Sequence, residues 1–206
     1  MRREYGTVLS AYIKNVMAAN LIESIQKSLG YPSLQKVDPN SHEIKNDAGR
    51  SGEEKLGQAA IPAVLTAIYR LSRSTEGSQY ILSVSGKGNK LDKLFGEKKK
   101  EAVEKIAQYS GATAQTVEES MEEITDESIR LIKETAGTSA TPEKIKTYMS
   151  NQRHHILVYL PAALQLGDLL NDESLDDRTN KMEGPVSGFL HRIENILSES
   201  DQSKYP

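Results

Sequence analysis

Apolar residues recur along this chain at steps of three and four, the spacing of one face of an α-helix. The first such pattern runs from Tyr5 to Leu29 and predicts one amphipathic helix, ended by Gly30 with Pro32 beyond it. Its apolar stripe comprises Val8, Leu9, Tyr12, Ile13, Val16, Met17, Leu21, Ile25 and Leu29. Residues 31–52 are polar and contain Pro and Gly, so we expect a linker or long loop there.

A second helical pattern begins near Leu56 and contains Pro62. Because proline removes a backbone hydrogen bond inside a helix, Pro62 predicts a kink or a new helix that starts at Ile61. Short helices separated by turns follow. The glycines of this region are Gly86, Gly88 and Gly96.

Residues 97–135 predict two helices joined at Gly111, with Thr113 capping the second. The expected buried stripe of the second helix is Val117, Met121, Ile124, Ile129 and Ile132. Thr141 and Pro142 then mark the start of another helix, which is expected to be helical from Ile145 to Leu170 and interrupted or bent at Pro161. A last amphipathic helix is predicted from Val186 to Leu197.

These elements predict an all-α fold, a compact multihelical bundle with kinked central helices at Pro62 and Pro161. The expected organisation is an N-terminal amphipathic helix at 1–30, a polar linker or loop at 31–52, a helical domain at 53–199 and a disordered tail at 200–206. Two segments, 61–71 and 160–170, both carry a proline near the start of an Ala/Leu-rich run, which we interpret as two kinked core helices.

Composition narrows the function classes. The 206 residues include 26 basic and 29 acidic side chains, a formal net charge of −3, so no overall positive field draws the chain to nucleic acid or to an anionic membrane. Cysteine is absent, which removes disulfides, thiol catalysis and thiolate metal sites. The longest apolar stretch, from Ile156, is too short to span a bilayer. We therefore expect a cytoplasmic protein without membrane association.

The stretch EKIAQYSGATAQTVEESMEEI, residues 104–124, has the spacing of a helix-turn-helix at Ala107, Gly111 and Val117. A DNA-reading second helix needs cations toward the phosphates. This one carries only carboxylates before Arg130, namely Glu118, Glu119, Glu122, Glu123, Asp126 and Glu127. The preceding helix has Lys98, Lys99, Lys100 and Lys105. We interpret the spacing as packing, and a basic protein surface as a better partner for this helix than DNA.

Other candidate sites are weak. His154 and His155 are adjacent, so on a helix they point about 100° apart and do not share a metal face. Residues 172–183 place Asp172, Ser174, Asp176 and Glu183 at calcium-loop positions. The position that requires glycine holds Asp177 and the usual apolar position holds Thr179, so we interpret the segment as a polar loop. The two remaining histidines are His42 and His191.

No pattern pairs a nucleophile with a base. Residues 83–90, SVSGKGNK, lack Walker spacing, and neither Ser85 nor Ser110 lies in a nucleophile elbow. Asp168 and Asp172 are scattered carboxylates that only a shared cleft would make catalytic. We predict no catalytic, cofactor-binding or metal residues and no cofactor.

Several segments resemble the YidB-like bacterial proteins of unknown function. The matching residues are Ile61, Pro62, Ala63, Val64, Leu65, Glu76, Gly77, Gly88, Leu91, Leu94, Phe95, Gly96, Ser110 and Gly111. The similarity covers about residues 60–135, with 170 as its outer bound. This chain has Lys and Glu where the family is expected to have Gly, Ala and Leu, and it carries an extra helix before residue 30. The resemblance implies an all-α fold and supplies no activity or catalytic set.

The function expected from the sequence is a non-enzymatic helical interaction or scaffold protein with a protein partner or with itself as partner. The first alternative is nucleic-acid binding through the lysines near 98–105, and the second is a small hydrolase that uses clustered carboxylates.

Overall fold

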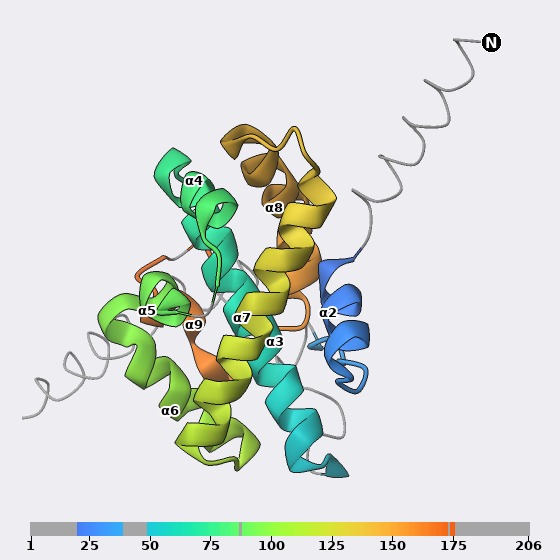
Figure 1. Ribbon diagram of the computed structural model, residues 1–206. Helices are drawn as coiled ribbons and strands as arrows, with labels where there is room; N and C mark the ends of the chain where they lie inside the picture. Colours follow the sequence, from blue (N-terminus) through green and yellow to red (C-terminus); the bar gives the residue numbers. More distant parts are fainter. Residues whose placement is uncertain (1–19, 39–48, 87, 173, 176–206) are drawn as a thin grey trace, which may run out of the picture.

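The computed structural model describes residues 20–38, 49–86, 88–172 and 174–175, and over these the chain is helical without strands, as the sequence predicted (Figure 1). The α-helices are α2 (Leu21–Leu29), α3 (Gly52–Ser72), α4 (Thr75–Ser83), α5 (Lys90–Phe95), α6 (Lys99–Ser110), α7 (Ala114–Ala136), α8 (Pro142–Leu157) and α9 (Leu166–Leu169). Two short 3-10 turns, η2 (Gly96–Lys98) and η3 (Ala162–Leu164), complete the order. The predicted helix at 186–197 and the tail at 200–206 lie outside the described residues.

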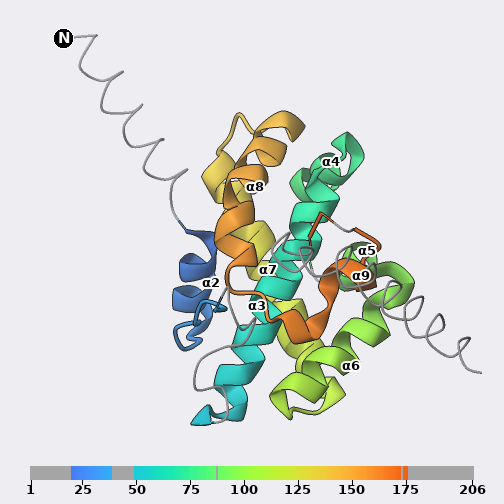
Figure 2. The same cartoon turned by 180° about the vertical axis from the view of Figure 1, so that it is seen from behind.

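Helix α3 is the centre of the bundle. Its side chains from Leu56 to Ile68 are buried without interruption, and α4, α6, α7 and α8 all pack against it (Figures 1 and 2). Because the residues of this stretch are mostly apolar and lie on all sides of the helix, other helices must cover it. Its start is fixed by a capping box, in which the Glu54 amide donates to Ser51 Oγ at 3.2 Å and the Ser51 amide donates to Glu54 Oε2 at 2.7 Å.

The two prolines behave differently from each other. Helix α3 runs through buried Pro62 as one helix, so no new helix begins at Ile61. Of the two alternatives predicted at Pro161, an interruption or a bend, the structure shows the interruption, and it begins before the proline. Helix α8 ends at Leu157, and Pro161 has an extended backbone with φ −62° and ψ 129°. Proline disfavours helical geometry at the residue before it, and here the chain leaves the helix before reaching that position.

The predicted hairpin ends are confirmed. Gly111 closes α6 in the left-handed conformation with φ 77°, and Thr113 Oγ1 accepts the Thr116 amide at 3.1 Å to open α7. Thr141 caps α8 in the same way, with Pro142 as its first residue. Each residue of the predicted α7 stripe is buried, and Thr125 and Ser128 on the same face are buried as well.

Helix α2 begins later than predicted. Asn20 is its N-cap, with a backbone at φ −68° and ψ 112° and its side-chain oxygen accepting the Ile22 amide at 3.1 Å, so the predicted helix from Tyr5 is not continuous across this residue. Residues 1–19 lie outside the described residues. The Leu21 amide donates to Oε1 of buried Gln152 at 3.1 Å, which fixes the start of α2 on α8.

A buried glutamine binds the segment that follows α2. Gln58 is 0% exposed, and its amide contacts the backbone of Gln35 on both sides, accepting from N at 2.8 Å and donating to O at 3.0 Å. The same Nε2 donates to the Tyr159 carbonyl at 2.7 Å, and Arg50 Nη1 donates to Oε1 at 3.0 Å. One side chain of α3 therefore joins residues 30–38, the approach to α3 and the turn after α8.

Thr66 offers a test of the cost of a buried hydroxyl. It is 0% exposed on α3, and its Oγ1 has no hydrogen-bond partner among the described residues. A buried hydroxyl without a partner costs stability, so Thr66→Val is expected to raise the free energy of unfolding by about 1–2 kcal/mol in urea titrations. The control is Thr125→Val, because Thr125 is equally buried but donates to the Met121 carbonyl at 2.7 Å. A gain at Thr125 that equals the gain at Thr66 would contradict this explanation.

Candidate interaction surface

The α6–α7 hairpin faces its apolar side inward. Val117 and Met121 are both 0% exposed, which is the position expected if the hairpin spacing serves packing. A helix that reads DNA makes its contacts through the residues on its exposed face, so the charges of that face decide what the hairpin can bind. The surface of the hairpin therefore consists of the charged side chains that remain outside the core.

The lysines near 98–105 that were predicted as phosphate contacts form pairs with other side chains of this protein. Salt bridges join Lys98–Glu101, Lys99–Asp92, Lys99–Glu118 and Lys100–Glu104, with N···O distances of 2.9, 2.7, 3.0 and 3.8 Å. Lys105 Nζ donates to Gln165 Oε1 at 3.2 Å. The two carboxylates around Lys99 raise its pKa through hydrogen bonds. These lysines are interleaved with carboxylates, which weakens the positive potential that a phosphate backbone would meet.

The outer side of α7 carries the opposite charge. Glu119, Glu122 and Glu123 are exposed at helical steps of three and four, so they lie on one face. Within the described residues, no salt bridge neutralises Glu122 or Glu123, and Glu119 accepts only the Gln115 amide nitrogen at 2.9 Å. Like charges at these steps destabilise a helix slightly, so an opposing positive surface would relieve their repulsion.

Tyr31 extends this surface toward α3. Its ring packs on Gly57, where an added Cβ would lie 2.8 Å from the Tyr31 Cδ1 atom. The Tyr31 hydroxyl forms a hydrogen bond with Ser120 and is within electrostatic range of Glu123 and Glu53. Burial is the largest cause of its raised pKa, and the two glutamates raise it further.

These residues define the acidic face: Tyr31, Glu53, Glu119, Ser120, Glu122 and Glu123. Along α7 the acidic face ends before Arg130, which pairs with Glu127 at 2.6 Å and with Glu134. The hydrogen bond from Arg130 lowers the pKa of Glu127. Glu127 also accepts the Ser28 hydroxyl of α2, so this part of α7 is engaged internally and the acidic face stops before it.

The other sequence candidates are not brought together. His154 and His155 are exposed on α8 with ring centroids 6.1 Å apart, and no group of metal-binding side chains forms among the residues that the structure describes. Asp168 is exposed, whereas Asp172 pairs with Arg73 at 2.5 Å. Most of the predicted calcium loop, and both His42 and His191, fall outside the described residues.

The serine and glycine motifs form hydrogen bonds that stabilise the fold. Ser110 is buried, donates its hydroxyl to the Ile106 carbonyl at 2.8 Å and accepts the Ala112 amide at 3.2 Å. In the 83–90 segment, buried Lys90 donates to the Gly86 carbonyl at 2.5 Å and pairs with Asp126 of α7. Lys90 therefore anchors the loop to the bundle. In the part of the chain described, no helix combines the length and apolar character that crossing a membrane requires.

Comparisons with protein-family models, with curated proteins and with solved structures give no match. The resemblance to the YidB-like proteins therefore rests on the quoted sequence segments. Tyr31 and Glu53 are the surface residues that the sequence did not single out. The only signal at Tyr31 was its position between a helix-ending glycine and a proline, where the chain direction is fixed.

Proposed function

We propose that this protein is a non-enzymatic helical interaction protein that binds a basic protein surface through the acidic face. The observation that carries the proposal is the contrast between the two arms of one hairpin. Lys98, Lys99 and Lys100 form salt bridges with carboxylates of the same chain, whereas Glu122 and Glu123 of α7 are exposed without a cationic partner among the described residues. Carboxylates in this state repel a polyanion and attract lysine or arginine.

Tyr31 supplies the second element of a binding surface. Interfaces are enriched in tyrosine, whose ring contributes contact area and whose hydroxyl contributes a hydrogen bond. Here the ring is held on Gly57 and the hydroxyl on Ser120, so little side-chain freedom is lost when a partner covers it. We also propose a cytoplasmic location for the protein, the location expected from its sequence.

We also propose that the chain is related to the YidB-like family. Many of the residues that carry the resemblance pack in the core. Ile61 to Leu65 are buried in α3, and Leu91, Leu94 and Phe95 are buried in α5. Gly96 and Gly111 have positive φ of 57° and 77°. A shared pattern made of packing and turn residues is what relatives with a common fold and no common catalytic set would retain.

The test uses neutralising variants that keep side-chain size. Glu119, Glu122 and Glu123 are replaced together by glutamine, and the charge-matched control replaces Glu76, Glu97 and Glu143, which are exposed elsewhere. Full-length wild type and both variants capture proteins from native lysate, and the captured proteins are quantified by mass spectrometry. We expect at least one basic protein to bind wild type and the control and to be reduced about tenfold or more on the acidic-face variant, which corresponds to loss of a few exposed charge pairs.

The acidic-face variant should remain folded, because removing like charges at i, i+4 adds a few tenths of a kcal/mol to helix stability. Equal thermal stability therefore accompanies the expected loss of binding. Identical captured proteins in identical amounts for all three proteins would overturn the proposal. So would salt-sensitive binding of wild type to duplex DNA or single-stranded RNA in a filter assay, because the acidic face opposes such binding.

A further inference from the structure

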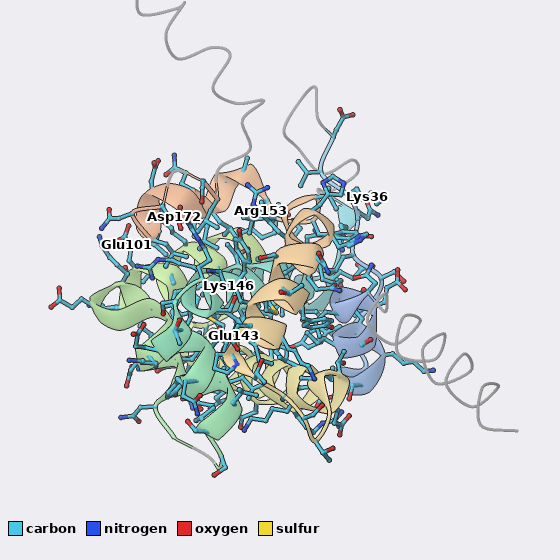
Figure 3. The ribbon with its side chains drawn as sticks, turned by 90° about the horizontal axis from the view of Figure 1, so that it is seen from above. Lys36, Glu101, Glu143, Lys146, Arg153 and Asp172 are labelled. Carbon is cyan, nitrogen blue, oxygen red and sulfur yellow. The ribbon has the colours of Figure 1, made fainter. Side chains whose placement is uncertain are left out.

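The segment after α9 returns to the side of the bundle formed by α3 and α8. Leu175 is 1% exposed and its amide donates to the Asp172 carbonyl at 2.9 Å, while the Asp172 amide donates to the Gly167 carbonyl at 2.9 Å. Figure 3 shows Asp172 and Arg153 of α8 on the same side of the molecule. Residues 172 and 174–175 are thus docked on the helical core.

Two arginines from separate parts of the chain contact Ser174. Arg73, which follows α3, donates from Nη1 to Asp172 Oδ2 at 2.5 Å and to Ser174 Oγ at 3.1 Å. Arg153 donates from Nη2 to the Ser174 carbonyl at 2.5 Å. Ser174 itself is exposed, and its hydroxyl donates to Asp172 Oδ1 at 2.5 Å. An exposed serine with one guanidinium on its hydroxyl and a second on its backbone carbonyl is an arrangement that can receive a phosphate.

We propose that Ser174 is a phosphorylation site whose phosphate is bound by Arg73 and Arg153. A serine kinase that prefers acidic substrates fits the surrounding sequence DESLDD. In the step, Ser174 Oγ forms a bond to the terminal phosphorus of a nucleoside triphosphate, the bond from that phosphorus to the bridging oxygen breaks, and the nucleoside diphosphate leaves. The hydroxyl proton passes to the base of the kinase.

The phosphate changes the partner of Arg73. It adds a charge of about −1.5 to −2 and strong acceptor oxygens, which compete with the single carboxylate of Asp172 for the guanidinium. Repulsion between the phosphate and the Asp172 carboxylate also favours the transfer of Arg73 from Asp172 to the phosphate. With Arg73 and Arg153 both on the phosphate, α3, α8 and the segment that contains Leu175 are joined through charge-assisted bonds. The modification therefore holds this segment in its docked position.

Burial of Leu175 also affects how fast the kinase can phosphorylate Ser174. A kinase binds its substrate in an extended form, so it acts when the segment is transiently released from the core. Leu175→Ala weakens the docking and is expected to increase the rate of labelling at Ser174 about tenfold or more, because the docked state loses the contacts of a buried leucine. Wild-type protein is labelled slowly and then held docked.

The experiment treats the full chain with an acidophilic serine kinase and ATP, and maps the product by mass spectrometry. Ser174→Ala is the control for site identity, and Arg73→Gln combined with Arg153→Gln removes the two guanidiniums. Hydrogen exchange at the Leu175 amide is expected to slow about tenfold or more on phosphorylation of wild type, since each charge-assisted bond exceeds the strength of a neutral one. The slowing is expected to vanish in the double arginine variant.

Absence of label at Ser174 in both wild type and Leu175→Ala would overturn the assignment of the modification site. If Ser174 is labelled but hydrogen exchange at the Leu175 amide of wild type is unchanged or faster, binding of the phosphate by Arg73 and Arg153 is refuted. Phosphoserine installed directly at position 174 gives the same exchange measurement independently of any kinase. Neither result depends on the acidic face, so failure here leaves the proposed partner surface standing.

Discussion

Replacing Gly77 with alanine is expected to lower the free energy of unfolding by roughly 2–4 kcal/mol, the range of strongly overpacked core substitutions. Gly77 lies in the first turn of α4, pressed against the last turn of α3. An added Cβ would stand 1.9 Å from the Leu71 carbonyl oxygen and 2.9 Å from Ser74 Oγ. Because the nearest atom belongs to backbone, relief requires the turn between α3 and α4 to open, and the helix propensity gained by alanine does not offset that cost.

Thermal unfolding provides the measurement for Gly77. A loss of this size corresponds to a fall in Tm of roughly 5–15 °C for a chain of this length. Gly52→Ala is the matched control, since a Cβ at Gly52 in the first turn of α3 would meet only the Ser110 carbonyl oxygen at 3.7 Å, an ordinary contact. Melting of the Gly77 variant within a degree of the Gly52 variant would show that the turn adapts easily and that the close approach is unimportant.

Replacing Gln58 with leucine is expected to cost about 3–5 kcal/mol, because it leaves several buried polar groups without partners. The Gln35 amide and carbonyl, the Tyr159 carbonyl and one nitrogen of Arg50 all lose the contact they make with this side chain. Leucine has similar volume and keeps the helix propensity of α3, so the loss reports the polar contacts.

The control for Gln58 is Gln35→Ala. Gln35 is exposed and contacts Gln58 through its backbone alone in the bonds described, so alanine preserves them and stability should change by less than about 0.5 kcal/mol. Urea titration measures both variants, and hydrogen exchange follows the Gln35 and Val37 amides, the latter donating to the Val158 carbonyl at 2.9 Å. Equal stability of the Gln58 and Gln35 variants would contradict the role of the buried amide.

Features that depend on neighbouring residues were predictable from the sequence. Gly30, Gly111, Thr113 and Thr141 act at helix ends through hydrogen bonds or backbone angles that span a few residues. The α7 stripe was predictable for the same reason, since one periodic face suffices to define what is buried. The all-α class follows from these local signals added along the chain.

Features that depend on distant residues were not predictable. Asn20 interrupts an apolar pattern that continues through it, and the chain leaves α8 before Pro161 although the apolar residues persist to Leu170. Nothing in the sequence marks Gln58 as buried. It is buried because the backbone of residues 30–38 packs against it and forms hydrogen bonds with its side-chain amide. Which polar residues are buried depends on which distant segments pack together, and the periodicity of the sequence does not contain this information.

The candidate surface was predictable in part. The negative charge of α7 and its mismatch with a polyanion follow directly from residues 118–127. The pairing of Lys99 with Asp92 and Glu118 joins α5, α6 and α7. The position of Tyr31 beside Glu53 and Ser120 joins the segment after α2 to α3 and α7. The meeting of Arg73 and Arg153 at Ser174 likewise spans about a hundred residues and left no sequence signal.

The most direct measurement is the dissociation constant of the captured basic partner, determined across salt concentrations for wild type, the acidic-face variant and the charge-matched control. Binding through the acidic face predicts weakening of about tenfold or more for the acidic-face variant at low salt, a smaller difference as salt screens the charges, and a control that matches wild type. Equal dissociation constants for all three proteins at every salt concentration would contradict the claim that Glu119, Glu122 and Glu123 form the binding surface.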